Sequence, residues 1–217
     1  MLIKEAEWIG ESLPLLDLKQ GSVFLNFGAQ TKEYNQENNH ILRYLINPIK
    51  SKHTIKNLDL QKGEGIDFSG DILDDIFFNE LKKNKFHCIL LCNVLEHVHD
   101  INKITQRLSD LMESGTYLIF SGPYKYPVHY DPIDNGFRPT VKEVEKLFPD
   151  LINVKSQIVI DHTYSFYLFS SFKKFAVTFL RILSPFYKFS KWKNVVLPKL
   201  RYLNKNFEAT CIVFKKP

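Results

Sequence analysis

The chain has 217 residues, 44% of them hydrophobic, which is enough to bury one sizeable core and leaves little room for two independent domains. Its first residues, MLIKEAEWIGE, carry charges where a signal peptide has its apolar region, and no apolar run approaches the ~20 residues that span a bilayer. Three cysteines, an odd number, argue against a disulfide framework. We therefore expect one cytoplasmic domain over residues 1–217.

The net charge of +5 hides an uneven distribution. Residues 163–206 contain nine Lys or Arg and no Asp or Glu, whereas in the rest of the chain 20 basic residues stand against 24 acidic ones. The average charge therefore says little about binding partners, and the basic segment says more.

Strand-like and helix-like segments alternate along the chain. Strands are expected at Ser22–Phe27, Thr54–Leu58, Phe86–Cys92, Thr116–Ser121, Val154–Asp161 and Ala209–Phe214. Helices are expected at Asn35–Leu45 (ending before Pro48), Asp74–Lys83, Ile101–Met112 and Val141–Phe148. This alternation predicts an α/β fold with a doubly wound, Rossmann-like, mostly parallel sheet.

The strand at Phe86–Cys92 breaks suddenly into a polar turn, which is how an open α/β sheet places a ligand site at the carboxyl ends of its strands. The turn sequence, Asn93-Val94-Leu95-Glu96-His97-Val98, resembles the fourth-strand motif of class I S-adenosylmethionine-dependent methyltransferases. The resemblance implies S-adenosylmethionine as cofactor, with its amino-acid end held by the backbone around Asn93 and Val94. His97 would face the site, either as a general base or as a structural histidine that caps the turn.

Three earlier segments follow the order of the same family. The turn after the first strand resembles the glycine-rich loop and keeps one glycine, Gly28, where the family has two or three. At the end of the second strand, Asp59 is either the acceptor of hydrogen bonds from both ribose hydroxyls or a solvated turn residue. The segment Asp67–Asp71 resembles the one whose Asp, here Asp71, receives the adenine amino group. The cofactor contacts implied are Asn26, Gly28, Ala29, Asp59, Asp71, Asn93 and Val94.

The segment Gly122–Arg138 holds three Pro, three Tyr and several ionisable groups. It resembles the active-site loop of methyltransferases of carbohydrate and polysaccharide biosynthesis. His129 in this loop is the first choice of catalytic base, and His97 in the turn after Cys92 is the second. The substrate contacts implied are Tyr124, Asp131 and Arg138. In the alternative interpretation, prolines stiffen the loop and Arg138 pairs with an Asp. The histidines show no spacing diagnostic of a metal site, so no metal is predicted.

In the fold that the chain resembles, the last two strands form a C-terminal antiparallel hairpin; here the basic segment 163–206 is inserted between them. Apolar residues recur at helical spacing at Phe172, Phe175, Ala176, Phe179, Leu180 and Leu183. Basic residues fall on the opposite face, so the pattern predicts an amphipathic basic helix that Pro185 ends. Three interpretations stay open: a lid packed on the sheet, an anchor at an anionic membrane surface, or nucleic-acid binding, for which no recognised module is visible.

Together these patterns predict methyl transfer to an oxygen or nitrogen of a small molecule, a sugar or a glycan or lipid-linked intermediate. The enzyme would act in the cytoplasm or peripherally at the inner face of the membrane. The alternative is a methyltransferase-like scaffold that no longer binds the cofactor and docks a partner or a membrane surface. The acceptor atom and the oligomeric state do not follow from the sequence.

Overall fold

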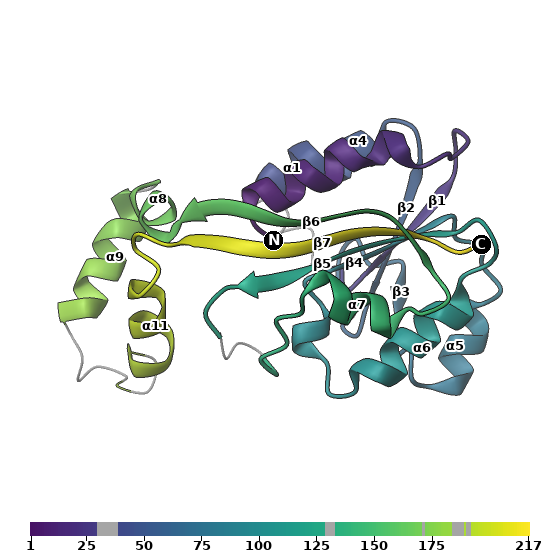
Figure 1. Cartoon of the computed structure of the whole chain (residues 1–217). Helices are drawn as coiled ribbons and strands as arrows, with labels where there is room; N and C mark the ends of the chain where they lie inside the picture. The colour runs from purple at the N-terminus through teal and green to yellow at the C-terminus, as the bar shows by residue number, and fades with distance from the viewer. Residues whose placement is uncertain (30–38, 129–132, 171, 184–188, 190–191) are drawn as a thin grey trace.

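The computed structural model describes residues 1–29, 39–128, 133–170, 172–183, 189 and 192–217. Within them a seven-stranded sheet has the order β3-β2-β1-β4-β5-β7-β6 (Figure 1). The strands are β1 (Val23–Phe27), β2 (Thr54–Asp59), β3 (Phe68–Ser69), β4 (Cys88–Cys92), β5 (Tyr117–Lys125), β6 (Ile152–Thr163) and β7 (Asn206–Lys215). The first five pair in parallel, and β7 is antiparallel to both β5 and β6. The predicted sheet with its C-terminal antiparallel hairpin is confirmed.

The central strands are apolar on both faces because helices cover both sides of the sheet. On one side Leu25, Ile89 and Leu118 pack with α5 (Asp75–Leu81), α6 (Ile101–Leu111) and α7 (Val141–Leu147). On the other side Phe24, Leu90 and Ile119 pack with α1 (Ile3–Ser12) and with the helical stretch made of α3 (Asn39–Ile41), a π-helical turn (Leu42–Ile46) and α4 (Asn47–Lys50). Figure 1 shows these two layers above and below the sheet.

Side-chain caps explain where the predicted helices begin. The carboxylate of Asp74 accepts from the Phe77 amide at the start of α5, and that of Asp100 accepts from the Lys103 amide at the start of α6. Thr140 and Glu143 form a reciprocal capping box at α7.

Three expectations about element boundaries are wrong. The helical stretch does not end before Pro48: it continues through a π-helical turn into α4, in which Pro48 is the second residue. Strand β5 runs four residues beyond Ser121, because its last part pairs with β7 up to Lys125. Helix α1 was not expected at all, since it was considered only as a possible leader segment.

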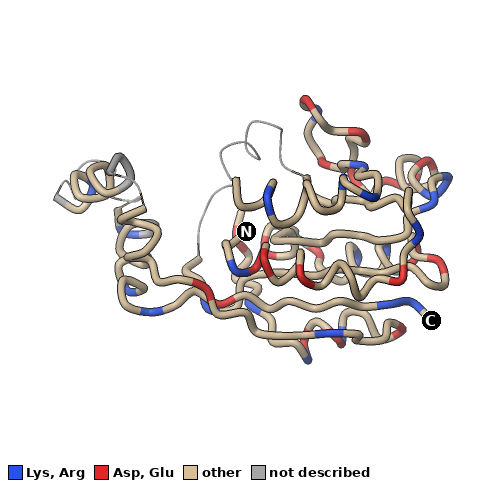
Figure 2. The backbone as a smooth tube through the Cα atoms, turned by 90° about the horizontal axis from the view of Figure 1, so that it is seen from above, with Lys and Arg blue, Asp and Glu red and all other residues tan. Residues whose placement is uncertain are grey.

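The insert between β6 and β7 forms a helical arm, residues 164–205, at the far end of the β6–β7 pair (Figures 1 and 2). It contains α8 (Tyr164–Phe169), α9 (Phe172–Leu183), a π-helical turn (Trp192–Val196) and α11 (Leu197–Leu200). Helix α9 is the predicted amphipathic helix, and it contacts α8 and the π-helical turn of the arm. Its Phe179 and Leu180 are 51% and 62% exposed, so this helix is not a lid packed on the sheet.

The base of the arm is fastened to the first turn of α1. The Lys4 amide donates to Oδ1 of Asp161 (3.1 Å) and the Ile3 amide to the hydroxyl of Tyr167 (3.2 Å). The Tyr167 hydroxyl in turn donates to Oδ2 of Asp161. The buried carboxylate of Asp161 thus accepts from one free amide at the helix N-terminus, where negative charge is favoured, and the Tyr167 hydroxyl that it holds accepts from a second.

Candidate functional site

A cavity of about 310 Å³ lies at the carboxyl ends of β1, β4 and β5. We call it the sheet-edge cavity. Its lining includes Glu5, Asn26, Gly28, Asn93, Glu96 and His97. The sheet order places β1 and β4 side by side here, and their outward helices lie on opposite faces, so this is the topological switch point at which open α/β sheets bind ligands.

Gly28 makes the turn that ends β1. Its φ is +74°, and a Cβ at this position would lie 2.6 Å from Cγ2 of Val94. The amides of Gly28 and Ala29 both donate to the carbonyl oxygen of Leu58, each at 2.9 Å. Glycine is therefore required here by the backbone angle and by the close packing of the β1 turn on the β4 turn.

Asn93 begins the turn after β4 in the left-handed conformation, with φ of 54°. Among residues with a side chain, Asn tolerates this conformation well, and such strain is commonly found at functional sites. The Asn93 amide donates to the carbonyl oxygen of Ser121 (2.8 Å), and its side-chain amide donates to Oε1 of Glu5 (2.6 Å).

Glu5 is a site residue that the sequence analysis missed. It is 1% exposed and accepts three hydrogen bonds: from the Asn93 side chain, from the Ser121 hydroxyl (2.6 Å) and from the Leu2 amide (2.8 Å). Its carboxylate therefore binds α1 to the ends of β4 and β5. The first two partners lie 88 and 116 residues along the chain, and no local pattern reports such pairing.

Glu96 and His97 stand together on the turn after β4. Glu96 is 2% exposed, and burial raises the pKa of its carboxyl group to about 7. The ring Nδ1 of His97 hydrogen-bonds to the carbonyl oxygen of Ile133, so Nδ1 carries the proton in the neutral ring. Nε2 of His97 then holds the lone pair, 3.9 Å from Oε1 of Glu96. This is the arrangement that a general base needs.

The raised pKa of Glu96 predicts how stability depends on pH. Between about pH 4.5 and 7 the folded state binds more protons than the unfolded state. The stability that protonated Glu96 contributes is therefore fully present below pH 4.5 and is lost as pH rises through the folded pKa. We expect the loss to be about 3 kcal/mol. Urea unfolding at pH 5 and pH 8 should show it in the wild type, and Glu96→Gln should lack it. The histidines with lowered pKa are present in both proteins, so they cannot cause a difference between them. Equal pH dependence in wild type and Glu96→Gln would therefore contradict the raised pKa of Glu96.

Two of the predicted cofactor contacts, Asp59 and Asp71, are not among the described residues that line the sheet-edge cavity. Oδ1 of Asp59 accepts from the Gln61 amide (2.9 Å), and Oδ1 of Asp71 accepts from the Leu73 amide (2.9 Å). Asp59 follows Leu58, whose carbonyl oxygen receives the Gly28 amide, so it stands beside the β1 turn. Both stay predictions. Asn26, Gly28, Ala29 and Asn93 do line the cavity, and Val94 packs against Gly28.

The segment after β5 is placed in part. His129 and Asp131 lie outside the described residues. Tyr124 belongs to β5 and lines neither this cavity nor the larger one described below, whereas Tyr126 lines both. Tyr126 lies in the predicted loop just beyond the end of β5, where Tyr124 was the tyrosine expected to contact substrate.

Arg138 pairs with an Asp, as one of the two interpretations expected. Its Nη2 lies 2.6 Å from Oδ2 of Asp134, and the pair is largely buried. Nε of Arg138 also donates to the carbonyl oxygen of Tyr126 (3.2 Å). The structure thus shows Arg138 as a clamp on the backbone that positions Tyr126; direct contact with substrate stays a prediction.

Over the described residues no group of three or more His, Cys, Asp or Glu is placed to hold a metal ion. In the same part of the chain, no helix is both long enough and apolar enough to cross a bilayer. The three cysteines are free.

Comparison with known proteins gives the fold and nothing finer. No protein-family model matches the chain, and no curated protein matches it in sequence. Similar solved structures include a coclaurine N-methyltransferase bound to N-methylheliamine and S-adenosylhomocysteine (TM-score 0.57, 13% identity, 98% of this chain and 70% of that one). A second is a methyltransferase of Thiobacillus denitrificans with S-adenosylhomocysteine (TM-score 0.55, 10% identity, 99% of this chain and 91% of that one). A third is the [4+2]-cyclase SpnF (TM-score 0.57, 11% identity, 97% of this chain and 80% of that one). The chain thus has the Rossmann-like fold that S-adenosylmethionine-dependent methyltransferases share.

Proposed function

We propose that this protein is an S-adenosylmethionine-dependent methyltransferase that acts on an oxygen or nitrogen of a small molecule. The observation that carries the proposal is the sheet-edge cavity: a tight glycine turn after β1 and the Asn93–His97 turn after β4 meet at the switch point of the sheet. The same turn sequence carries the resemblance to class I methyltransferases.

The charge of the cavity suits a sulfonium cofactor. Its described lining contains the carboxyl groups of Glu5 and Glu96 and no Lys or Arg. A carboxylate is the natural partner of a positive group in a partly enclosed site. When bound, the cofactor supplies an electrophilic methyl group. We assign its contacts to Asn26, Gly28, Ala29, Asp59, Asp71, Asn93 and Val94.

The base in this proposal is His97. Nε2 takes the proton from the hydroxyl or amine of the acceptor, and the Glu96 carboxyl group 3.9 Å away stabilises the imidazolium that forms. The hydrogen bond from Nδ1 to Ile133 holds the ring in this orientation. His129 remains the other candidate, from the part of the loop that the structure does not describe.

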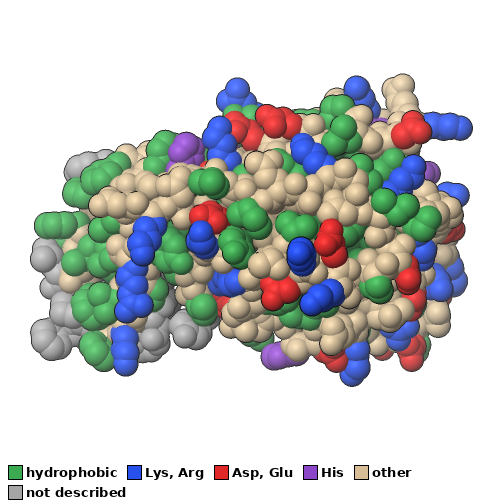
Figure 3. All heavy atoms as spheres, viewed as in Figure 1, with side chains coloured by type: hydrophobic (Ala, Val, Ile, Leu, Met, Phe, Trp, Pro, Cys, Tyr) green, Lys and Arg blue, Asp and Glu red, His purple; other side chains and the backbone are tan. Residues whose placement is uncertain are grey.

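For the acceptor we propose a sugar or a glycan or lipid-linked intermediate. The support is the resemblance of residues 122–138 to loops of carbohydrate-modifying methyltransferases, together with the position of Tyr126, from this loop, in the cavity wall. The arm supports peripheral membrane contact, since hydrophobic and basic side chains lie next to each other on it (Figure 3). Among the described side chains of the arm, the exposed large hydrophobic ones are Phe166, Phe169, Val177, Phe179, Leu180 and Phe189.

One observation favours the alternative of a scaffold without cofactor. The amides of Gly28 and Ala29 are both used by Leu58, and the loop has lost the further glycines of the family. The fold also serves other activities, as the cyclase among the similar structures illustrates.

Titration of the purified protein with S-adenosylmethionine and S-adenosylhomocysteine distinguishes the methyltransferase from the scaffold without cofactor. We expect micromolar dissociation constants, about 8 kcal/mol of binding free energy. Gly28→Ala should weaken binding tenfold or more, because the new methyl group would displace Val94. Gly115→Ala is the matched control: its φ is +84° but nothing lies within 4 Å, so affinity should stay unchanged. No binding at millimolar cofactor would contradict the enzyme and support the scaffold.

A further inference from the structure

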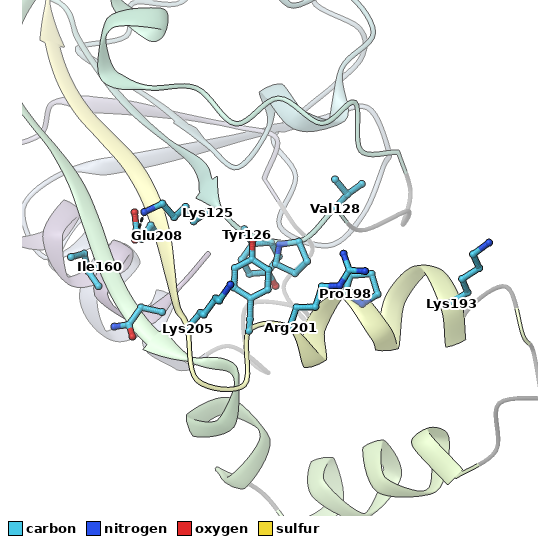
Figure 4. Close-up of a pocket in the computed structure, with 12 residues that line it drawn as sticks. Lys125, Tyr126, Val128, Ile160, Lys193, Pro198, Arg201, Lys205 and Glu208 are labelled. Carbon is cyan, nitrogen blue, oxygen red and sulfur yellow. Dashed lines mark hydrogen bonds and ion pairs between the residues drawn. The ribbon is translucent and has the colours of Figure 1, made fainter.

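A second and larger cavity, about 990 Å³, lies between the end of β5 and the arm (Figure 4). We call it the arm cavity. Lys125, Tyr126 and Val128 come from β5 and the chain after it, whereas Lys193, Pro198 and Arg201 come from the helical side of the arm. Lys205 and Glu208 lie near the start of β7. The cavity therefore exists only because the insert stands beside the sheet.

The lining of the arm cavity is strongly basic. It contains Lys125, Lys193, Arg201 and Lys205 against one carboxylate, Glu208. That carboxylate is already paired with Lys125, at 3.0 Å, and the pairing raises the pKa of Lys125. No ion pair joins the other three cations to any described residue, and all three are exposed.

The surrounding chain offers these cations little countercharge. Residues 162–207 contain no Asp or Glu. Figure 2 shows basic residues along the arm, with acidic residues only at its base. The nearest acid before it, Asp161, is buried and occupied by the Lys4 amide and Tyr167. Three cations that pair with no described residue, around one cavity, attract a multiply charged anion, and guanidinium and ammonium groups are the usual protein ligands of phosphate.

The arm cavity adjoins the sheet-edge cavity. Tyr126 lines both, and the neighbouring residues Glu208 and Ala209 of β7 line the arm cavity and the sheet-edge cavity respectively. The two cavities have opposite charge, with carboxyl groups in one and cations in the other. A positively charged cofactor and a negatively charged acceptor would thus be sorted into neighbouring sites.

We propose that the arm cavity binds the phosphate or diphosphate group of the methyl acceptor, through Arg201, Lys205 and Lys193. This inference rests on the proposed function for its placement beside the cofactor. The tyrosine rings of Tyr126 and Tyr202 at the same cavity offer apolar faces to the organic part of that acceptor. The phosphate can belong to a soluble sugar phosphate or to a lipid-linked one.

Inorganic pyrophosphate is the probe, titrated calorimetrically into the whole chain. We expect saturable binding that Arg201→Gln weakens about tenfold, equivalent to about 1.4 kcal/mol. Arg181→Gln is the matched control: it removes the same charge from an exposed position of the arm that does not line the cavity, so affinity should be unchanged. Equal affinity in wild type and Arg201→Gln, or equal losses in both variants, would overturn the proposal.

A titration with S-adenosylmethionine in the same buffers keeps the two proposals apart. Arg201→Gln should bind the cofactor as the wild type does. If the cofactor binds and pyrophosphate does not, the methyltransferase stands and the arm-cavity assignment falls. If pyrophosphate binds with the Arg201 dependence and the cofactor does not, the anion site stands and its role in methyl transfer falls.

Vesicles distinguish the two sources of the phosphate. Co-sedimentation with phosphatidylcholine vesicles containing phosphatidic acid should be reversed by pyrophosphate if a lipid phosphate enters the arm cavity. If the protein does not sediment with the vesicles, or if pyrophosphate does not reverse its sedimentation, the bound phosphate belongs to a soluble acceptor. A chain lacking residues 164–205 serves as the reference for arm-dependent sedimentation.

Discussion

Replacing Glu5 with alanine should destabilise the protein by about 3–5 kcal/mol, because the buried Ser121 hydroxyl and the partly buried side-chain amide of Asn93 would lose their acceptor. The helix that Glu5 fastens would also come away from the sheet-edge cavity, which Leu2 and Glu5 line. We therefore expect affinity for S-adenosylmethionine to fall by a hundredfold or more. Urea unfolding and calorimetric titration measure the two effects.

Glu7→Ala provides the matched control for this prediction. Glu7 lies two residues along the same helix and pairs with Lys4 at the surface, at 2.7 Å. Exposed pairs of this kind contribute about 0–1 kcal/mol. Comparable losses in Glu5→Ala and Glu7→Ala would mean that the helix itself, and not the buried carboxylate, accounts for the effect.

Arg138→Ala should cost about 3–5 kcal/mol of folding free energy, because it removes the Arg138 guanidinium from its ion pair with the fully buried carboxylate of Asp134. The carbonyl oxygens of Tyr126 and Phe137 would lose donors as well. Since Tyr126 stands in the wall shared by both cavities, ligand binding at each should weaken along with stability. The measurement is urea unfolding of the variant against the wild type.

Arg107→Ala is the comparison for Arg138, since its partner Asp75 is largely exposed and the expected cost is about 1 kcal/mol or less. The double variant Arg138→Met with Asp134→Leu removes both charges together and should be more stable than Arg138→Ala. An Arg138→Ala protein within 1 kcal/mol of the wild type would show that the clamp is not needed.

The sheet could be predicted because its central strands are buried on both faces and so appear as short apolar runs between turns. The turn at Asn93–His97 was found for the same reason, since polar residues follow such a run abruptly. The predicted starts of α6 and α7 agree with the structure, in which Asp100 and Thr140 cap the two helices. These features all depend on neighbours within a few residues along the chain.

What the sequence did not reveal depends on distant neighbours. Glu5 has its role only through Asn93 and Ser121, which the sheet order brings to the start of α1. Glu96 belonged to the recognised turn, but only its burial in the folded chain raises its pKa and marks it as a partner for His97. Tyr126 lies in the predicted loop, but its place in the walls of both cavities depends on Glu208 and Ala209 of β7, more than 80 residues later.

The arm also has a consequence for the time course of folding. Strands β6 and β7 pair as a hairpin, yet roughly 40 residues separate them where a hairpin loop normally has a few. Closing this loop costs about 2 kcal/mol more in chain entropy than closing one of four residues. Strand β7 must also find β5, far earlier in the chain, before the edge of the sheet is complete. Contacts this distant in sequence slow folding, so the C-terminal half of the sheet forms late, and during that interval the edge of β5 is open to pairing with other chains.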